Sequence, residues 1–156
     1  VVRLLAELGA DVETPMNDGA TPAYIAAQEG HLEVVRVLAE LGANVNTSRN
    51  DGCTPAWIAA ANGHLDVVRL LAKLGANVTT PMNDGATPAF IAAHEGHVEV
   101  LRVLAKLGAN VNTPDNNGGT PHSTRLNLNF VSVGSLIVIS YLSDTSPSSS
   151  LYEKNL

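Results

Sequence analysis

The sequence has few aromatic residues, little positive charge and a single cysteine. Aromatic residues make up 4% of the 156 positions, which favours an architecture of many small, similar contacts over one bulky central core. Nine Lys and Arg residues stand against 15 Asp and Glu, with no basic run, so the composition argues against nucleic-acid binding. The lone Cys53 excludes an intramolecular disulfide and a cysteine-only zinc site, and mildly favours an intracellular compartment, cytoplasmic or nuclear.

A unit of 33 residues repeats along most of the chain. Residues 14–46 and 80–112 differ at only 5 of 33 positions, and residues 47–79 differ from the first unit at 10. Residues 1–13 match the end of a unit, and residues 113–121 begin a further one. Units of this length that cannot bury their apolar faces alone stack on one another, which predicts a solenoid.

Each unit reads as two short helices and a turn. Thr21 is a good N-cap, and the proline after it is tolerated at the first helical position, so a helix is expected over 22–28. A second helix is expected over about 32–41, where the apolar spacing gives one buried face. Gly30 and Gly42 end the two helices, and Asn-Asp-Gly at 17–19 predicts a turn.

These motifs together resemble the ankyrin repeat family. The resemblance rests on Thr-Pro-Ala-aromatic-Ile-Ala-Ala at 21–27, Gly-His at 30–31 and Leu-Gly-Ala-Asn-Val-Asn at 41–46, with their counterparts in the other units. It covers residues 1–121. It implies an all-α repeat solenoid of stacked helix-turn-helix units joined by β-turn or hairpin loops, followed by a non-repeat tail at 122–156.

The units depart from the family pattern at two places. The family's usual histidine in the first helix is replaced by Tyr24, Trp57 and Phe90. We expect these aromatic residues to pack between neighbouring first helices, rather than to anchor a partner. The usual hairpin aspartate is present only at Asp115, which puts some of the hairpin hydrogen bonds of the other units in doubt.

The residues that could carry catalysis or bind a metal follow the repeat instead of converging. His31, His64 and His97 occupy one slot in successive units, whereas metal ligands must meet within about 2 Å of one ion. We expect each histidine to help start the second helix. Cys53 has no partner base and fills a slot that holds alanine in other units. The sequence therefore predicts no enzyme activity, no metal, no cofactor and no small-molecule substrate.

The resemblance implies binding of a partner protein through the turn tips and the concave face of the first helices. The units differ from one another at such positions, although neutral variation at exposed sites explains this equally well. The candidate partner-binding residues are Met16, Asn17, Arg49, Asn50, Met82, Asn83, Asp115 and Asn116 at the tips, and Gln28, Ala61 and His94 on the first helices. Met16 and Met82 are expected to be exposed and to offer adaptable apolar contacts.

The expected function is thus a protein–protein interaction module, a scaffold or adaptor, whose partner the sequence does not identify. The alternative is a regulatory or targeting ankyrin segment of a larger enzyme or channel, with the activity outside these residues. In either case the chain is expected as a monomer or as part of a longer array, without a membrane span.

The two ends of the chain differ from the repeats. Because the chain starts at Val1 with no leader pattern, we expect residues before it in the gene product; the apolar residues 1–8 are expected to fray or associate. In the tail, 9 of the 10 serines lie in 122–156. Residues 131–142 are apolar but too short to span a membrane, and 143–150 read as disordered. A non-homologous translated segment is favoured over a divergent cap.

Overall fold

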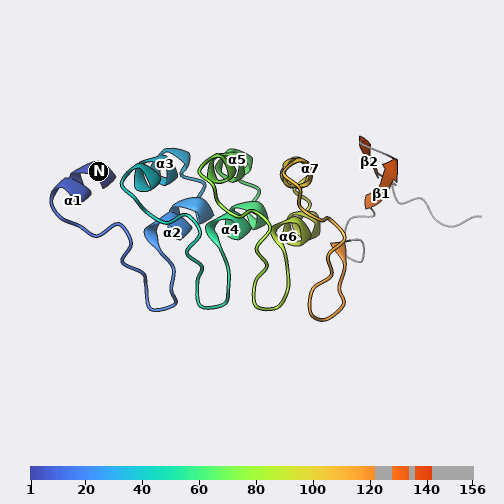
Figure 1. The fold of residues 1–156 in the computed structure, drawn as a ribbon, viewed down its shortest axis with the longest axis horizontal. Helices are drawn as coiled ribbons and strands as arrows, with labels where there is room; N and C mark the ends of the chain where they lie inside the picture. Colours follow the sequence, from blue (N-terminus) through green and yellow to red (C-terminus); the bar gives the residue numbers. More distant parts are fainter. Residues whose placement is uncertain (122–127, 134–135, 142–156) are drawn as a thin grey trace, which may run out of the picture. The chain divides into compact units, whose positions relative to one another are not determined.

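The computed structural model describes residues 1–121, 128–133 and 136–141. The chain divides into two units, residues 1–126 and residues 127–156. The helices of the first unit form two rows, with hairpin loops projecting beyond the row of first helices (Figure 1). One row holds α1 (Val2–Glu7), α3 (Leu32–Glu40), α5 (Leu65–Lys73) and α7 (Val98–Lys106), and the other holds α2 (Pro22–Gln28), α4 (Pro55–Ala61) and α6 (Pro88–Glu95). The predicted all-α repeat solenoid is confirmed.

The first helix of each unit begins as the sequence predicts. The Thr21 hydroxyl accepts a hydrogen bond from the Tyr24 backbone N–H at 3.2 Å, and a proline occupies the first helical position. Thr54 and Thr87 make the same bond at 3.1 Å. All three threonines are buried, so a matched donor and acceptor offset the cost of removing their hydroxyls from water.

The core lies in thin layers between and within the helix pairs. First helices contribute alanines with almost no exposed surface, such as Ala23, Ala27 and their counterparts. Second helices turn a stripe of larger residues toward them, for example Leu71 in α5 and Leu104 in α7. Because alanine keeps the backbones close, each first helix needs only one bulky aromatic residue, Tyr24, Trp57 or Phe90, and the aromatic content stays low.

The histidines join neighbouring units. Nε2 of His64 lies 2.9 Å from the backbone oxygen of Gln28, and Nε2 of His97 lies 2.9 Å from that of Ala61. Both histidines occupy the N-cap position of a second helix, but neither side chain makes a capping hydrogen bond. The histidines therefore stand at the start of the second helices, as expected, where their backbone oxygens accept the first helical hydrogen bonds, but their side chains do not cap these helices. They bond to the unit before instead.

The hairpin loops close through their backbones. The Met16 N–H donates to the Ala20 oxygen at 2.8 Å, and the other three loops repeat this bond. The hairpin loops therefore form in all four units, including the three that lack the family's usual aspartate. Asp115, which has the family's usual residue, also accepts hydrogen bonds from the backbone N–H groups of Asn117 and Gly119.

The second unit contains an antiparallel hairpin of β1 (Leu128–Val133) and β2 (Leu136–Tyr141). Val133 pairs with Leu136 at one end of the two strands, and Leu128 pairs with Tyr141 at the other. The sequence analysis described residues 131–142 as apolar and assigned no strand to them, although their many β-branched residues favour strands. The expected disorder at 143–150 lies outside the described residues, and both accounts of the tail remain predictions.

Gly63→Ala is expected to destabilise the protein more than Gly75→Ala. Both glycines have positive φ angles, +74° and +83°, so alanine costs about 1–2 kcal/mol at either position. At Gly63 the new Cβ would also lie 2.6 Å from Nδ1 of His97, whereas nothing lies within 4 Å at Gly75. Overpacking adds about 1–3 kcal/mol. Urea denaturation followed by circular dichroism measures the difference, and equal losses would contradict the His97 contact.

The amide protons of α1 are expected to exchange at least about a hundredfold faster than those of α5. α1 contains no buried residue, and Leu4, Leu5 and Leu8 are 56%, 50% and 76% exposed. α5 has four buried residues by contrast. Hydrogen exchange of the dilute monomer measures both helices in one experiment. Equal protection of α1 and α5 would show that α1 is held more firmly than its contacts imply.

Candidate functional site

The four hairpin loops, 14–20, 47–53, 80–86 and 113–119, are called the tips below. Their asparagines link each tip to the one before it. Nδ2 of Asn50 donates to the Asn17 backbone oxygen at 3.3 Å, and Asn83 and Asn116 repeat this bond at 3.2 and 3.0 Å. The backbone N–H of Asn50 also donates to the oxygen of Asp18. These asparagines thus hold the tips in a row, a role that the sequence analysis missed.

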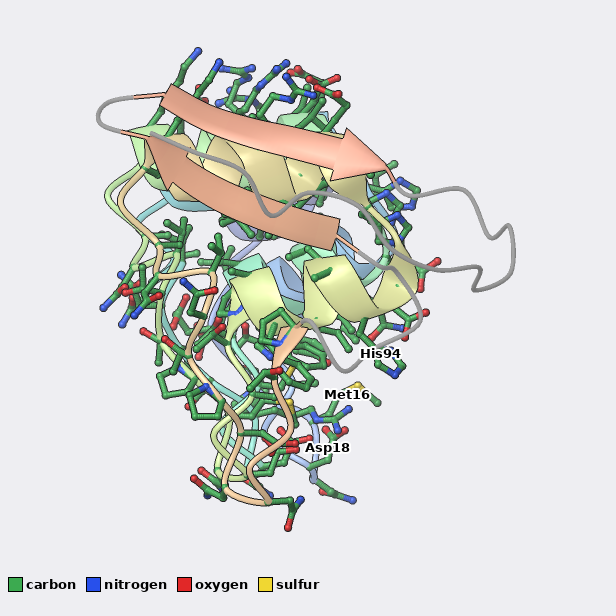
Figure 2. The ribbon with its side chains drawn as sticks, turned by 90° about the vertical axis from the view of Figure 1, so that its right-hand side faces the viewer. Met16, Asp18 and His94 are labelled. Atoms are coloured by element: carbon green, nitrogen blue, oxygen red, sulfur yellow. The ribbon has the colours of Figure 1, made fainter. Side chains whose placement is uncertain are left out.

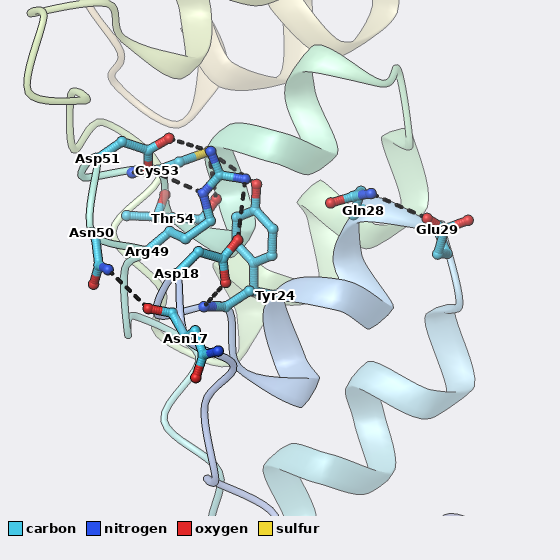
Figure 3. Close-up of polar contacts among 11 residues, drawn as sticks. Asn17, Asp18, Tyr24, Gln28, Glu29, Arg49, Asn50, Asp51, Cys53 and Thr54 are labelled. Atoms are coloured by element: carbon cyan, nitrogen blue, oxygen red, sulfur yellow. Dashed lines mark hydrogen bonds and ion pairs between the residues drawn. The ribbon is translucent and has the colours of Figure 1, made fainter.

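Arg49 is the centre of a charged network between the first two tips (Figure 3). Its guanidinium bonds to both carboxylate oxygens of Asp51, lies 3.8 Å from Asp18, and sits 5.6 Å from the centre of the Tyr24 ring. The hydrogen bonds from Arg49 hold the pKa of Asp51 below its usual value. The Arg49 side chain remains 34% exposed, so it can still contact a partner from one side.

The aromatic residues pack between units, as expected. Tyr24 is buried, and its hydroxyl lies 3.5 Å from Sγ of Cys53 in the next unit. Trp57 is half-buried and donates from Nε1 to the backbone oxygen of Ala86 at 2.9 Å. Burial raises the pKa of both the Tyr24 phenol and the Cys53 thiol. Both groups therefore stay protonated near neutral pH. A protonated thiol is a poor nucleophile, because the thiolate is the reactive form.

The predicted tip residues differ in exposure. Met16 is 62% exposed, but Met82 is half-buried and packs against the buried cluster that includes Cys53 of the unit before it. The expectation of two exposed methionines is therefore right for Met16 and wrong for Met82. Asn17, Asn50, Asn83 and Asn116 are exposed, whereas Arg49 and Asp115 are half-buried.

The three predicted first-helix residues lie on one side of their helices. His94 is exposed, and Gln28 and Ala61 are half-buried. Figure 2 shows His94, Met16 and Asp18 on the same side of the stacked helices and loops. The structure therefore brings first-helix and tip residues onto a common face.

One isoleucine from each first helix shares this side and was missed. Ile25 is 37% exposed, and Ile58 and Ile91 are half-buried. Each lies three and four positions before the variable residues at the helix end, which is the spacing of one helical face. That spacing is the signal that could have found them. The first-helix face is defined here as Ile25, Gln28, Glu29, Ile58, Ala61, Asn62, Ile91, His94 and Glu95.

Charge is unevenly divided between the two rows of helices. The tips, first helices and following Gly-His turns (14–31, 47–64, 80–97 and 113–121) contain six acidic residues and one basic residue, Arg49. The second helices and their loops (1–13, 32–46, 65–79 and 98–112) contain seven acidic and six basic residues. Since the whole chain has a net charge of −6, nearly all of it lies on the tips and first helices.

Within the described residues, no group of three or more His, Cys, Asp or Glu side chains could hold a metal ion. In the same part of the chain, no helix is long and apolar enough to cross the bilayer. An open, mostly apolar groove of about 310 Å³ lies beside Met16, Ile25 and His31. The described surface thus offers contacts for binding, with its polar groups largely engaged in joining units.

Comparison with known families agrees with this geometry. A family model described as ankyrin repeats, three copies, matches residues 1–49 and again residues 45–115. The chain belongs to the ankyrin repeat family. A search of curated proteins found no match. Ankyrin repeats generally mediate protein–protein binding and are typically non-catalytic.

Arg49→Met, which introduces the residue of two other tips, is expected to lower the unfolding free energy by about 1 kcal/mol at pH 7. The folded-state pKa of Asp51 is depressed, so its contribution is present above the ordinary aspartate pKa and is lost as pH falls below it. Urea denaturation at pH 7 and pH 3 should therefore show a smaller deficit at pH 3.

The control for this variant is Arg36→Met. Arg36 pairs only with the exposed Glu33 on the same helix, so its loss should change the unfolding free energy by less than about 0.5 kcal/mol. A deficit of the same size at both pH values for Arg49→Met would show that the Tyr24 ring contact, and not the carboxylates, carries the effect.

Proposed function

We propose that this ankyrin repeat protein binds a partner protein through its tips and first-helix face and has no catalytic activity of its own. The observation that carries the proposal is that several polar side chains bond to neighbouring units, which leaves one surface of the stack available for binding. His64, His97 and the tip asparagines bond to neighbouring units. The side chains that remain exposed on the tips and the first-helix face include apolar, polar and charged groups, and they are held on a rigid support.

The absence of catalysis is supported by the state of the two most reactive groups. Cys53 is 2% exposed, and burial raises the pKa of its thiol. The histidines are one unit apart, and His64 and His97 each contact a backbone oxygen. A nucleophile needs a base within hydrogen-bonding reach, and these histidines have their described contacts elsewhere.

Quantitative capture from an extract of the source cells tests the proposal. Met16→Asp is expected to lose specific partners that the unchanged chain retains, because it places a charge on a side chain that is 62% exposed beside an apolar groove. Leu74→Asp is the control, since Leu74 is also exposed, at 38%, but follows a second helix. If both variants lose the same partners, or if neither loses any, the tips and first-helix face are not the binding surface.

Calorimetry with the captured partner then tests single residues. Arg49→Ala and Met82→Ala are each expected to weaken binding about five- to tenfold, and Arg69→Ala is expected to leave it unchanged. Arg69 lies on the second helix α5, where its half-exposed side chain pairs with Asp66 of the same helix. If neither tip change weakens binding, those two residues do not belong to the site.

A further inference from the structure

We propose that the partner segment bound by this face is a cationic amphipathic α-helix with an apolar residue at every seventh position. The inference rests on the proposed function and adds the chemistry and shape of the partner. Two independent features carry it: the row of isoleucines on neighbouring first helices, and the concentration of the chain's negative charge around that row.

The isoleucine row sets a spacing. Ile25, Ile58 and Ile91 occupy the same position in α2, α4 and α6, which lie side by side (Figure 1). Packed helices are about 8–10 Å apart, so the exposed parts of successive isoleucines lie at about that interval. Ile25 is 37% exposed, whereas Ile58 and Ile91 are half-buried and Ile58 also packs against the buried cluster that contains Tyr24. An α-helix lying across the first helices would repeat one face every seven residues, about 10.5 Å along its axis.

A β-strand fits this row less well by its spacing, and a polyproline helix by the kind of surface that it binds. Side chains on one face of a β-strand are about 6.6 Å apart, so a strand meets the row at only some of its positions. A polyproline helix repeats every three residues, about 9.3 Å, but such segments dock in grooves lined by aromatic residues. Here Tyr24 and Phe90 are buried, and Trp57 is half-buried with its indole N–H bonded to the next unit.

The acidic residues around the isoleucine row favour a partner segment with positive charge. Glu29 and Glu95 lie at the ends of α2 and α6, and Asp18 and Asp84 lie in the tips below them. All four are exposed. Arg49, the single basic residue of the tips and first helices, already contacts Asp18 and Asp51. A helix with Lys or Arg beside its apolar stripe would thus find negative charge on both margins.

Defined peptides of 21 residues test the inference by calorimetry or fluorescence anisotropy. The probe is a helical peptide with Leu at every seventh position and Lys on both flanks of that stripe. Its controls are an isomer of the same composition with the leucines at every second position, a proline-rich peptide with Leu at every third, and a version with Glu in place of Lys. The probe should bind at least about tenfold more tightly than each control.

Matched variants locate the contact. Glu29→Gln with Glu95→Gln should weaken probe binding about fivefold in low salt, while Glu33→Gln with Glu99→Gln, which removes two carboxylates from second helices, should not. Ile25→Ser should also cost about fivefold. Leu41→Ser is its control, because both side chains are 37% exposed. Equal losses in either matched pair would overturn the assignment to this face.

The peptide controls test the helical shape and the positive charge of the partner segment separately from the proposed protein-binding function. Equal binding of the isomer would show that charge alone acts, and tighter binding of the proline-rich peptide would replace the helix by an extended partner; either result overturns the inference. If Met16→Asp still loses captured partners but the probe does not bind, the protein-binding function stands and the cationic helix does not. If neither binds this face, both fail.

Discussion

The structure depends on the stacking of each unit on the one before it. Histidine rings, tip asparagines and aromatic side chains join neighbouring units, as in the contacts of His64 with Gln28 and of Asn50 with Asn17. A two-helix unit is too small to bury its own apolar face, so these contacts are what make the chain fold. They also engage the polar groups that could otherwise carry chemistry, which restricts function to the surface that remains.

The course of the backbone could be predicted from the sequence because its signals are local. Thr21 and the proline after it begin a helix whatever surrounds them, and Gly30 and Gly42 end helices because they have φ angles of 73° and 93°, which favour glycine. The strands of the tail were missed for the opposite reason. A short β-branched run acquires a pairing partner only once its turn is known.

The directions of side chains could not be predicted, since they depend on the neighbouring unit. Met82 and Met16 occupy the same slot, yet Met82 packs against the buried cluster that includes Cys53, while Met16 is 62% exposed. The variable positions indicated the helix-end residues Gln28 and His94, but the isoleucines beside them are identical in every unit and looked like core. In a repeat protein, a residue that is identical in every unit can be either buried or on the surface. Only its position on the helical face distinguishes the two cases.

The arrangement of charge has an energetic consequence. Identical units place Asp18, Asp51 and Asp84 in register, and like charges held near one another repel. Arg49 offsets this repulsion between the first two tips, but the equivalent position beside Asp84 holds Met82, which has no charge. The stack therefore retains unfavourable electrostatic energy on the side that carries its partly exposed isoleucines. A cationic partner would relieve that repulsion as it covers the apolar row, so the same residues that weaken the isolated stack would strengthen the complex.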